Sequence, residues 1–133
     1  MINKDKLKHF IVNVLNHIKW FFQRIFRGYS DYDFWDFGEF ACRKILPYLK
    51  KWVAMERHGY PEDVGSFEEW NKILDEIVWA VEETATQKDE DAVHEKYGGF
   101  LTDNRAYTEL EAIWKRQERG MELFGKYIGA MWE

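Results

Sequence analysis

The stretch Ser66–Val81, "SFEEWNKILDEIVWAV", carries the pattern that decides the fold. Ser66 with Glu69 three residues later forms a capping box, which marks the start of a helix. Apolar side chains then recur every three or four residues, as they do along one face of a helix. That face comprises Phe67, Trp70, Leu74, Ile77 and Val81. The stretch therefore predicts an amphipathic helix that buries this face.

Three further segments repeat the same spacing. Their apolar faces are Leu7, Ile11, Val14, Ile18, Phe21 and Ile25; Phe37, Ala41, Ile45, Tyr48, Trp52 and Met55; and Leu110, Ile113, Gln117, Met121, Phe124, Ile128 and Met131. Gly28 is a natural stop for the first helix, and Thr102 or Asp103 can cap the last. Pro47 predicts a kink or split in the second. With no strand periodicity, the chain is expected to be all-α, a single-domain bundle of about four main helices over residues 1–133.

Two details qualify this bundle. Residues 82–105 turn polar and acidic, so we expect a mobile acidic connection there, with one short helix at most. Three glycines lie within the last helix at positions 120, 125 and 129. Each costs about 1 kcal/mol relative to Ala, so they predict that another helix or a bulky ring packs closely against them.

The charge is unevenly distributed. Residues 1–28 carry six Lys/Arg against one Asp, a net +5, whereas the remaining 105 carry thirteen against twenty-three, a net −10. An acidic body argues against general nucleic-acid binding, which needs clustered cations. The single cysteine, Cys42, excludes an internal disulfide and is expected to be a core thiol. No apolar run reaches the ~18 residues of a membrane span, and no signal peptide is recognisable.

The segment "RGYSDYDFWDF" at residues 27–37 holds five aromatics and three aspartates. As a joint between two helices, Ser30 and Asp33 would form a capping pair and the rings would fill the corner, with Trp35 buried. As a binding surface, its tyrosines would stack on a ligand together with the "HGYP" loop. We expect mainly a joint, with these candidate binding residues: Arg27, Tyr29, Tyr32, Trp35, Arg43, Arg57 and Tyr60.

Catalytic and metal motifs are weak. An EF-hand numbered from Asp31 would need Gly and Glu where Asp36 and Cys42 stand. The four histidines, His9, His17, His58 and His94, show no zinc spacing. A helical magnesium-dependent nucleotide hydrolase would need a second carboxylate helix to complement Asp75, Glu76, Glu82 and Glu83. We therefore expect no catalytic residue, no metal and no cofactor.

The first helix is both basic and aromatic, so an anionic membrane surface is one interpretation. Its polar face, however, includes Asn3, Asn13, Asn16 and Gln23, and its apolar face is as wide as that of the other helices. Docking into the bundle is therefore the expectation.

The order "FFQRIFRGYSDYDFWDF…ILPYLK…HGYP…EEWNKILDEIVWAVE…GMELFGKYIGAMW" resembles a widespread family of small hypothetical proteins from tailed phages and viral metagenomes. The resemblance spans nearly the whole chain except residues 84–105. Where such proteins tend to carry a carboxylate shortly after the Trp motif, this chain has Gly38. The resemblance implies a phage origin and expression in the cytoplasm of an infected bacterial host, but it implies no activity.

We therefore expect a non-enzymatic phage accessory protein that binds a host target, as an anti-defence protein. It would inhibit a host protein directly or sequester a nucleotide immune signal, for which rings and arginines are suited. The alternatives are the metal-dependent nucleotide hydrolase and a virion assembly or replication factor. A homo-oligomer is left open.

Overall fold

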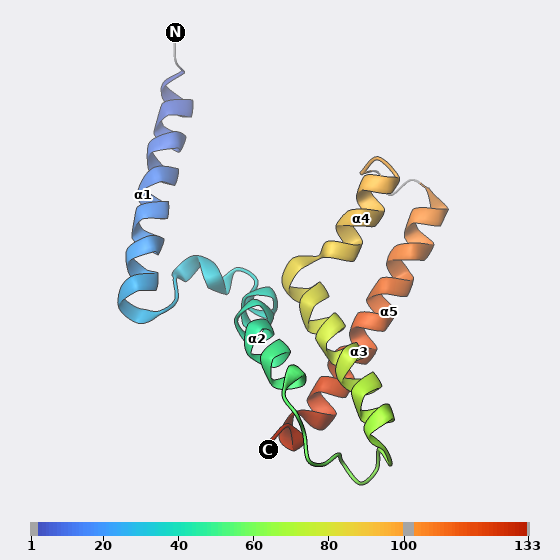
Figure 1. The fold of residues 1–133 in the computed structure, drawn as a ribbon. Coiled ribbons are helices and arrows are strands. Elements are labelled where there is room, and N and C mark those ends of the chain that lie inside the picture. Colours follow the sequence, from blue (N-terminus) through green and yellow to red (C-terminus); the bar gives the residue numbers. More distant parts are fainter. Residues whose placement is uncertain (1–2, 100–102, 133) are drawn as a thin grey trace. The chain divides into compact units, whose positions relative to one another are not determined.

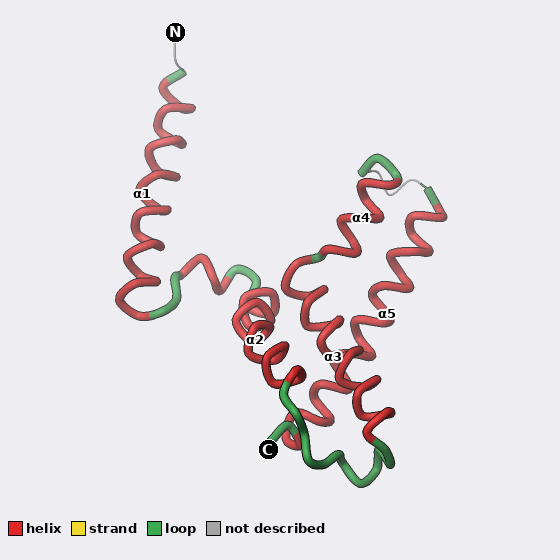
Figure 2. The backbone as a smooth tube through the Cα atoms, viewed as in Figure 1, coloured by secondary structure: helices red, strands yellow, loops and turns green. Residues whose placement is uncertain are grey.

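A computed structural model describes residues 3–99 and 103–132. Within these ranges the regular structure consists of α-helices and short 3-10 helices, and no strand occurs (Figure 1). The expected all-α class is confirmed. Figure 2 separates the helices from their connecting loops, among which the loop from α2 to α3 is long. The elements are α1 Lys4–Arg27, η1 Asp31–Phe34, α2 Phe37–Ala54, α3 Phe67–Thr86, α4 Lys88–Lys96, α5 Asn104–Tyr127 and η2 Ile128–Ala130.

The chain divides into two compact units, Met1–Phe40 and Ala41–Glu133. The first contains α1 and η1, and the second contains α3, α4, α5 and most of α2. Whether both fold together as the single predicted domain stays a prediction.

Helices α3 and α5 run side by side in the second unit (Figure 1), and apolar side chains of α2 complete the core there. The apolar face predicted for α3 is buried from Trp70 through Val81, although Phe67 at its start remains exposed. Ser66 caps the helix by accepting a hydrogen bond from the Glu69 N–H at 3.1 Å. On α5, Gln117 is the polar member of the predicted face, and its Nε2 donates to Thr84 Oγ1 at 2.7 Å. Thus the predicted faces of both helices are confirmed over most of their length, with one internal polar contact, although Ile128 of η2 is 54% exposed.

Gly120 allows α3 and α5 to come this close. A Cβ atom added at Gly120 would lie 2.3 Å from Ala80 Cβ and 2.8 Å from the Glu76 carbonyl oxygen. The prediction of close packing at the glycines of this helix is therefore correct for Gly120. It is wrong for Gly125 and Gly129, because an added Cβ there would meet nothing within 4 Å.

The helix count differs from the expected four because the chain turns sharply at Gln87. This residue adopts a left-handed conformation, with φ 55° and ψ 27°, and separates α3 from α4. The buried Glu83 carboxylate then accepts hydrogen bonds from the backbone N–H groups of Asp89 and Glu90 at the start of α4. The carboxylate both satisfies free N–H groups and complements the helix dipole.

The segment 82–105, for which we expect a mobile connection with one short helix, is helical over much of its length, and its mobility stays a prediction. Residues 82–86 belong to α3, and α4 covers Lys88–Lys96. Val93 of α4 packs with Ala106 and Leu110 of α5 in a small apolar cluster. One acid of this segment, Glu83, caps α4. Residues 100–102, including the proposed cap Thr102, lie outside the described residues. Asp103 caps α5 by accepting from the Arg105 N–H at 2.9 Å.

Helix α2 corrects two expectations. It runs from Phe37 to Ala54 without a break at Pro47, which is an exposed residue within the helix. A proline removes one backbone hydrogen bond, and the flanking turns persist here. The core face of α2 consists of Cys42, Leu46, Leu49 and Val53, offset from the predicted one. The predicted face included Tyr48, whose side chain is 77% exposed.

Helix α1 has no buried residue. The expectation that its apolar face docks in a core is therefore not met within the first unit. Its ends are as predicted: Gly28 terminates it in a left-handed conformation with φ 80°. Among the helices of the described residues, none combines the length and apolar character needed to cross a membrane.

Substituting Gly120 by Ala should destabilise the protein by about 3 kcal/mol or more, since the new methyl group would meet backbone as well as the Ala80 side chain. The matched control is Gly125→Ala on the same helix, which meets nothing and should gain up to about 1 kcal/mol from helix propensity. Urea unfolding of both variants measures the difference. Equal effects of the two substitutions would contradict the close approach.

Candidate functional site

The joint between α1 and η1 is held mainly by polar side chains. Ser30 and Asp33 are buried, and the Ser30 N–H donates to Asp33 Oδ2 at 2.8 Å, as the predicted capping pair requires. Arg24 Nη2 donates to Asp33 Oδ1 at 3.0 Å. Asp33 therefore accepts a hydrogen bond from the backbone N–H of Ser30 before η1 and forms an ion pair with Arg24 of α1. These contacts attach the turn to the helix.

Asp31 is the second anchor of this joint. Its carboxylate accepts a hydrogen bond from Gln23 Nε2 at 2.9 Å and pairs with Arg27, while Lys19 Nζ lies 3.4 Å away. The hydrogen bond from Gln23, followed by that from Arg27, lowers the pKa of Asp31 from 3.8 to about 2. Because this carboxyl is solvent-exposed, its contacts determine geometry more than stability.

Trp35 is not buried, which corrects the expectation for this segment. Its side chain is 85% exposed, because Ser30 and Asp33 occupy the inside of the turn in its place. The nearby rings contact one another at the surface: Tyr29 meets Phe34 edge-on at 5.5 Å, and Tyr32 lies 4.8 Å from Trp20. Arg27 covers the Tyr29 ring at 4.6 Å. Residues 27–37 are therefore a joint with a polar interior and an aromatic exterior.

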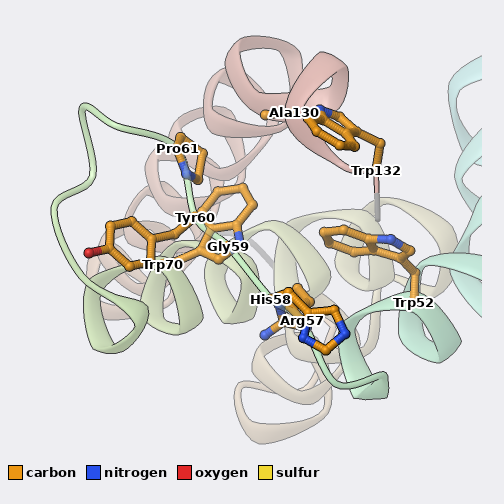
Figure 3. A pocket seen from close by; sticks show the side chains of 9 residues that line it. All are labelled: Trp52, Arg57, His58, Gly59, Tyr60, Pro61, Trp70, Ala130 and Trp132. Carbon is orange, nitrogen blue, oxygen red and sulfur yellow. The ribbon is translucent and has the colours of Figure 1, made fainter.

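A pocket of about 400 Å³ lies in the second unit, beside the loop that follows α2 (Figure 3). Three protein segments form it: the end of α2 with the loop, the start of α3, and the chain end after α5. The lining residues are Trp52, Arg57, His58, Gly59, Tyr60, Pro61, Trp70, Ala130 and Trp132. In the view of Figure 3, Trp52 and Trp132 lie to the right of the loop, the Tyr60 ring lies to its left, and the Trp70 side chain overlaps it.

The loop is fastened near both of its ends. At the start, the Arg57 guanidinium donates to the Val53 carbonyl oxygen and to Asn71 Oδ1 on α3. Towards the end, Asp63 Oδ2 accepts from the Tyr127 hydroxyl at 2.8 Å, and this bond lowers the pKa of Asp63. These contacts hold the loop against α3 and α5, so the pocket is largely preformed.

The pocket combines aromatic rings with the partly buried guanidinium of Arg57. Trp70 is 1% exposed and forms an apolar wall, whereas Trp132 is 76% exposed and is accessible to a ligand. Arg57 Cζ lies 5.5 Å from the centre of the Trp52 ring. Among the described residues no carboxylate oxygen lies within ion-pair distance of Arg57, and its buried Nε has no hydrogen-bond partner. The positive charge of Arg57 is thus not neutralised by a neighbouring acid.

The predicted binding residues fall into two groups. Arg27, Tyr29, Tyr32 and Trp35 lie in the first unit, and the first two contact each other directly. In the second unit Arg57 and Tyr60 line the pocket, whereas Arg43 is an exposed residue of α2 that does not line it. Because the groups belong to different units, a surface shared between them stays a prediction.

The tryptophans of the pocket are not among the residues that the sequence predicts for binding. Their spacing places Trp52 and Trp70 on buried helix faces and gives no role to Trp132. Spacing along the chain identifies a helix face but does not show that the segment after α5 returns to the loop. The signal available was the residue type, since Trp near a loop rich in Gly and Pro often serves in recognition.

The carboxylates considered for a hydrolase have structural partners. Glu76 accepts both hydrogen bonds of a bidentate pair with Arg116 at 2.9 Å, Glu82 pairs with Lys50 at 2.7 Å, and Glu83 caps α4. The pairing with Arg116 lowers the pKa of Glu76. Within residues 3–99 and 103–132, no three His, Cys, Asp or Glu side chains gather to hold a metal ion.

No family model, curated protein or solved structure matches this chain. The resemblance to the phage family therefore stays a prediction, and function has to be argued from the pocket and the helix faces themselves.

Substituting Trp35 by Ala is expected to change the free energy of unfolding by no more than about 0.5 kcal/mol, since the side chain is exposed. A buried Trp would instead cost about 3–5 kcal/mol. Chemical denaturation of the variant distinguishes the two values. A cost in the upper range would show that the ring is covered in solution.

The Asp31 carboxyl should titrate near pH 2 rather than at its ordinary value of 3.8. Because the folded pKa is lowered, the stabilising contribution of Asp31 is present above about pH 3.8 and is lost as the pH falls through 2. Titration of the carboxyl carbon by NMR measures this pKa. The Gln23→Ala variant should raise it; an unchanged value near 3.8 in both proteins would contradict the anchor.

Proposed function

We propose that this protein is a non-catalytic binding protein whose pocket at the Arg57–Pro61 loop binds a small nucleotide, that is, a ligand with a flat base and a negatively charged phosphate. The observation that carries the proposal is the combination of exposed and buried rings with the uncompensated charge of Arg57. A base would stack on Trp132 or Trp52, and its phosphate would lie near Arg57 and the exposed His58.

The dimensions and chemistry of the pocket support a ligand of this size. A volume of about 400 Å³ falls within the range of small-molecule sites, roughly 300–1,000 Å³. Flat aromatic faces accept any base, and arginine is the residue best suited to bind phosphate. The acidic body of the protein disfavours a long polyanion. A mononucleotide or a cyclic dinucleotide fits these constraints better than RNA or DNA.

The carboxylates of α3 already form ion pairs and hydrogen bonds that hold helices together, which favours this proposal over the metal-dependent hydrolase. Glu76, Glu82 and Glu83 each hold a helix in place through Arg116, Lys50 or the start of α4. Recruiting them to a metal would break these contacts. The expectations of a phage origin, a host target and an anti-defence role stay predictions alongside the binding proposal.

Calorimetric titration with AMP, adenosine and a cyclic dinucleotide tests the pocket. AMP should bind at least about tenfold more tightly than adenosine, because only AMP brings a charged group to Arg57. The Trp132→Ala variant should weaken AMP binding by about fivefold to 150-fold, the equivalent of one lost stacking contact of about 1–3 kcal/mol.

Trp35→Ala is the matched control, since Trp35 is equally exposed but lies in the other unit. It should leave binding unchanged. Equal binding by wild type and Trp132→Ala, or tighter binding of adenosine than of AMP, would overturn the proposed site. Absence of binding by all three compounds would overturn the nucleotide assignment.

A further inference from the structure

Helix α1 has two sharply different sides. At 3.6 residues per turn, its large apolar side chains cover an arc of roughly 160°. These side chains are exposed, with Phe10 at 65%, Phe21 at 60% and Phe26 at 82%. An exposed apolar face of this length on a 24-residue helix is unusual and indicates an interaction surface.

Among the described residues of the first unit, the contacts of α1 with η1 lie on its other side and at the edges of the arc. The only partly covered residues of the helix are Asn16, Trp20 and Gln23, which share the polar side. There Trp20 packs on Tyr32, and Gln23 exchanges hydrogen bonds with Asp31. The turn at η1 is therefore attached to the polar side, which leaves the whole apolar arc uncovered within the first unit.

Cations border the apolar arc on both edges. By helical position, Lys8 and Lys19 lie along one edge, and Lys6 and Arg24 lie along the other. Lys19 and Arg24 pair with Asp31 and Asp33. Near the start of the helix, Lys4, Lys6 and Lys8 are exposed, and among the described residues no carboxylate pairs with them.

We infer that α1 binds the surface of an anionic lipid membrane, lying parallel to it with the apolar arc inserted at the level of the headgroups. Phenylalanine and leucine side chains would enter the acyl boundary, while the lysines at both edges would reach the phosphates by extending their long chains. This arrangement matches the known features of interfacial helices: a wide apolar face, bordering cations and an otherwise polar opposite side.

Charge favours a lipid surface over a second copy of the chain. Asp5 is the one acid in the sequence of α1, so two such helices placed face to face would bring cationic edges together. An anionic membrane instead offers negative groups along both edges at once. The inference does not depend on the proposed pocket, which lies in the other unit.

Co-sedimentation of the full chain with phosphatidylcholine vesicles, with and without phosphatidylserine, tests the inference. Binding should require phosphatidylserine, and Lys4→Gln, Lys6→Gln and Lys8→Gln should each weaken it by about fivefold. Ile18→Glu, at the centre of the apolar arc, should weaken it by about tenfold or more. Asn13→Glu introduces the same charge on the polar side and should retain most of the binding.

Four results would overturn the inference. The first is absence of binding to phosphatidylserine vesicles; the second is equal binding by Ile18→Glu and Asn13→Glu. The third is a dimer in sedimentation equilibrium that Ile18→Glu converts to a monomer, since it would assign the apolar face to a second copy. An unchanged melting temperature of Ile18→Glu without lipid is expected because Ile18 is exposed, and a large decrease would show that the protein itself covers this face.

Discussion

The close approach of α3 and α5 at Ala80 and Gly120 is the constraint on which the second unit depends. Contacts on both sides of this crossing need the same short separation. One turn away, Arg116 forms its bidentate pair with Glu76 and lies 4.0 Å over the Trp79 ring. One turn beyond Ala80 along α3, Thr84 accepts a hydrogen bond from Gln117. A larger side chain at position 120 would separate the helices and weaken all these contacts together.

The geometry of the pocket depends on this crossing, because the crossing fixes where the end of α5 lies. Helix α5 carries Tyr127 to the loop after α2, where its hydroxyl bonds Asp63 and its ring packs edge-on against Trp70 at 5.3 Å. The segment that follows brings Trp132 to the pocket. The pocket is lined by residues of the region 52–61, by Trp70 and by the segment after α5, so it rests on a helix pair that contributes only Trp70 to its lining. Mutations at the crossing would therefore change the shape of the pocket without altering its lining residues.

Sequence periodicity predicted the helices well and their partners poorly. The α3 face from Trp70 to Val81 was correct because one continuous stripe coincides with the most buried part of the chain. For α2, two overlapping stripes exist, and the choice between them depends on which neighbour the helix meets. Within the described residues, the separation of α3 from α4 depends on a single Gln in a left-handed conformation, a residue type with no strong preference for it. Trp35 was misplaced because residue size suggested burial, whereas the turn is filled by the Asp33 ion pair.

The site was predictable only in part for a similar reason. Arg57 and Tyr60 were recognised from the composition of their loop, but the three tryptophans that complete the pocket are separated by up to eighty residues. Contacts over such distances depend on how helices pack, which a single sequence does not reveal. The amphipathic character of α1, by contrast, is entirely local and was evident from spacing alone.

This difference in range has a consequence for folding. The contacts that attach η1 to α1 join residues at most twelve positions apart, such as Trp20 with Tyr32 and Lys19 with Asp31. In the second unit, Arg116 and Glu76 are 40 positions apart, and Tyr127 and Asp63 are 64 apart. Local contacts form quickly, and distant ones require costly loop closure. The contacts between η1 and α1 can therefore form before those that join α3, α5 and the loop after α2.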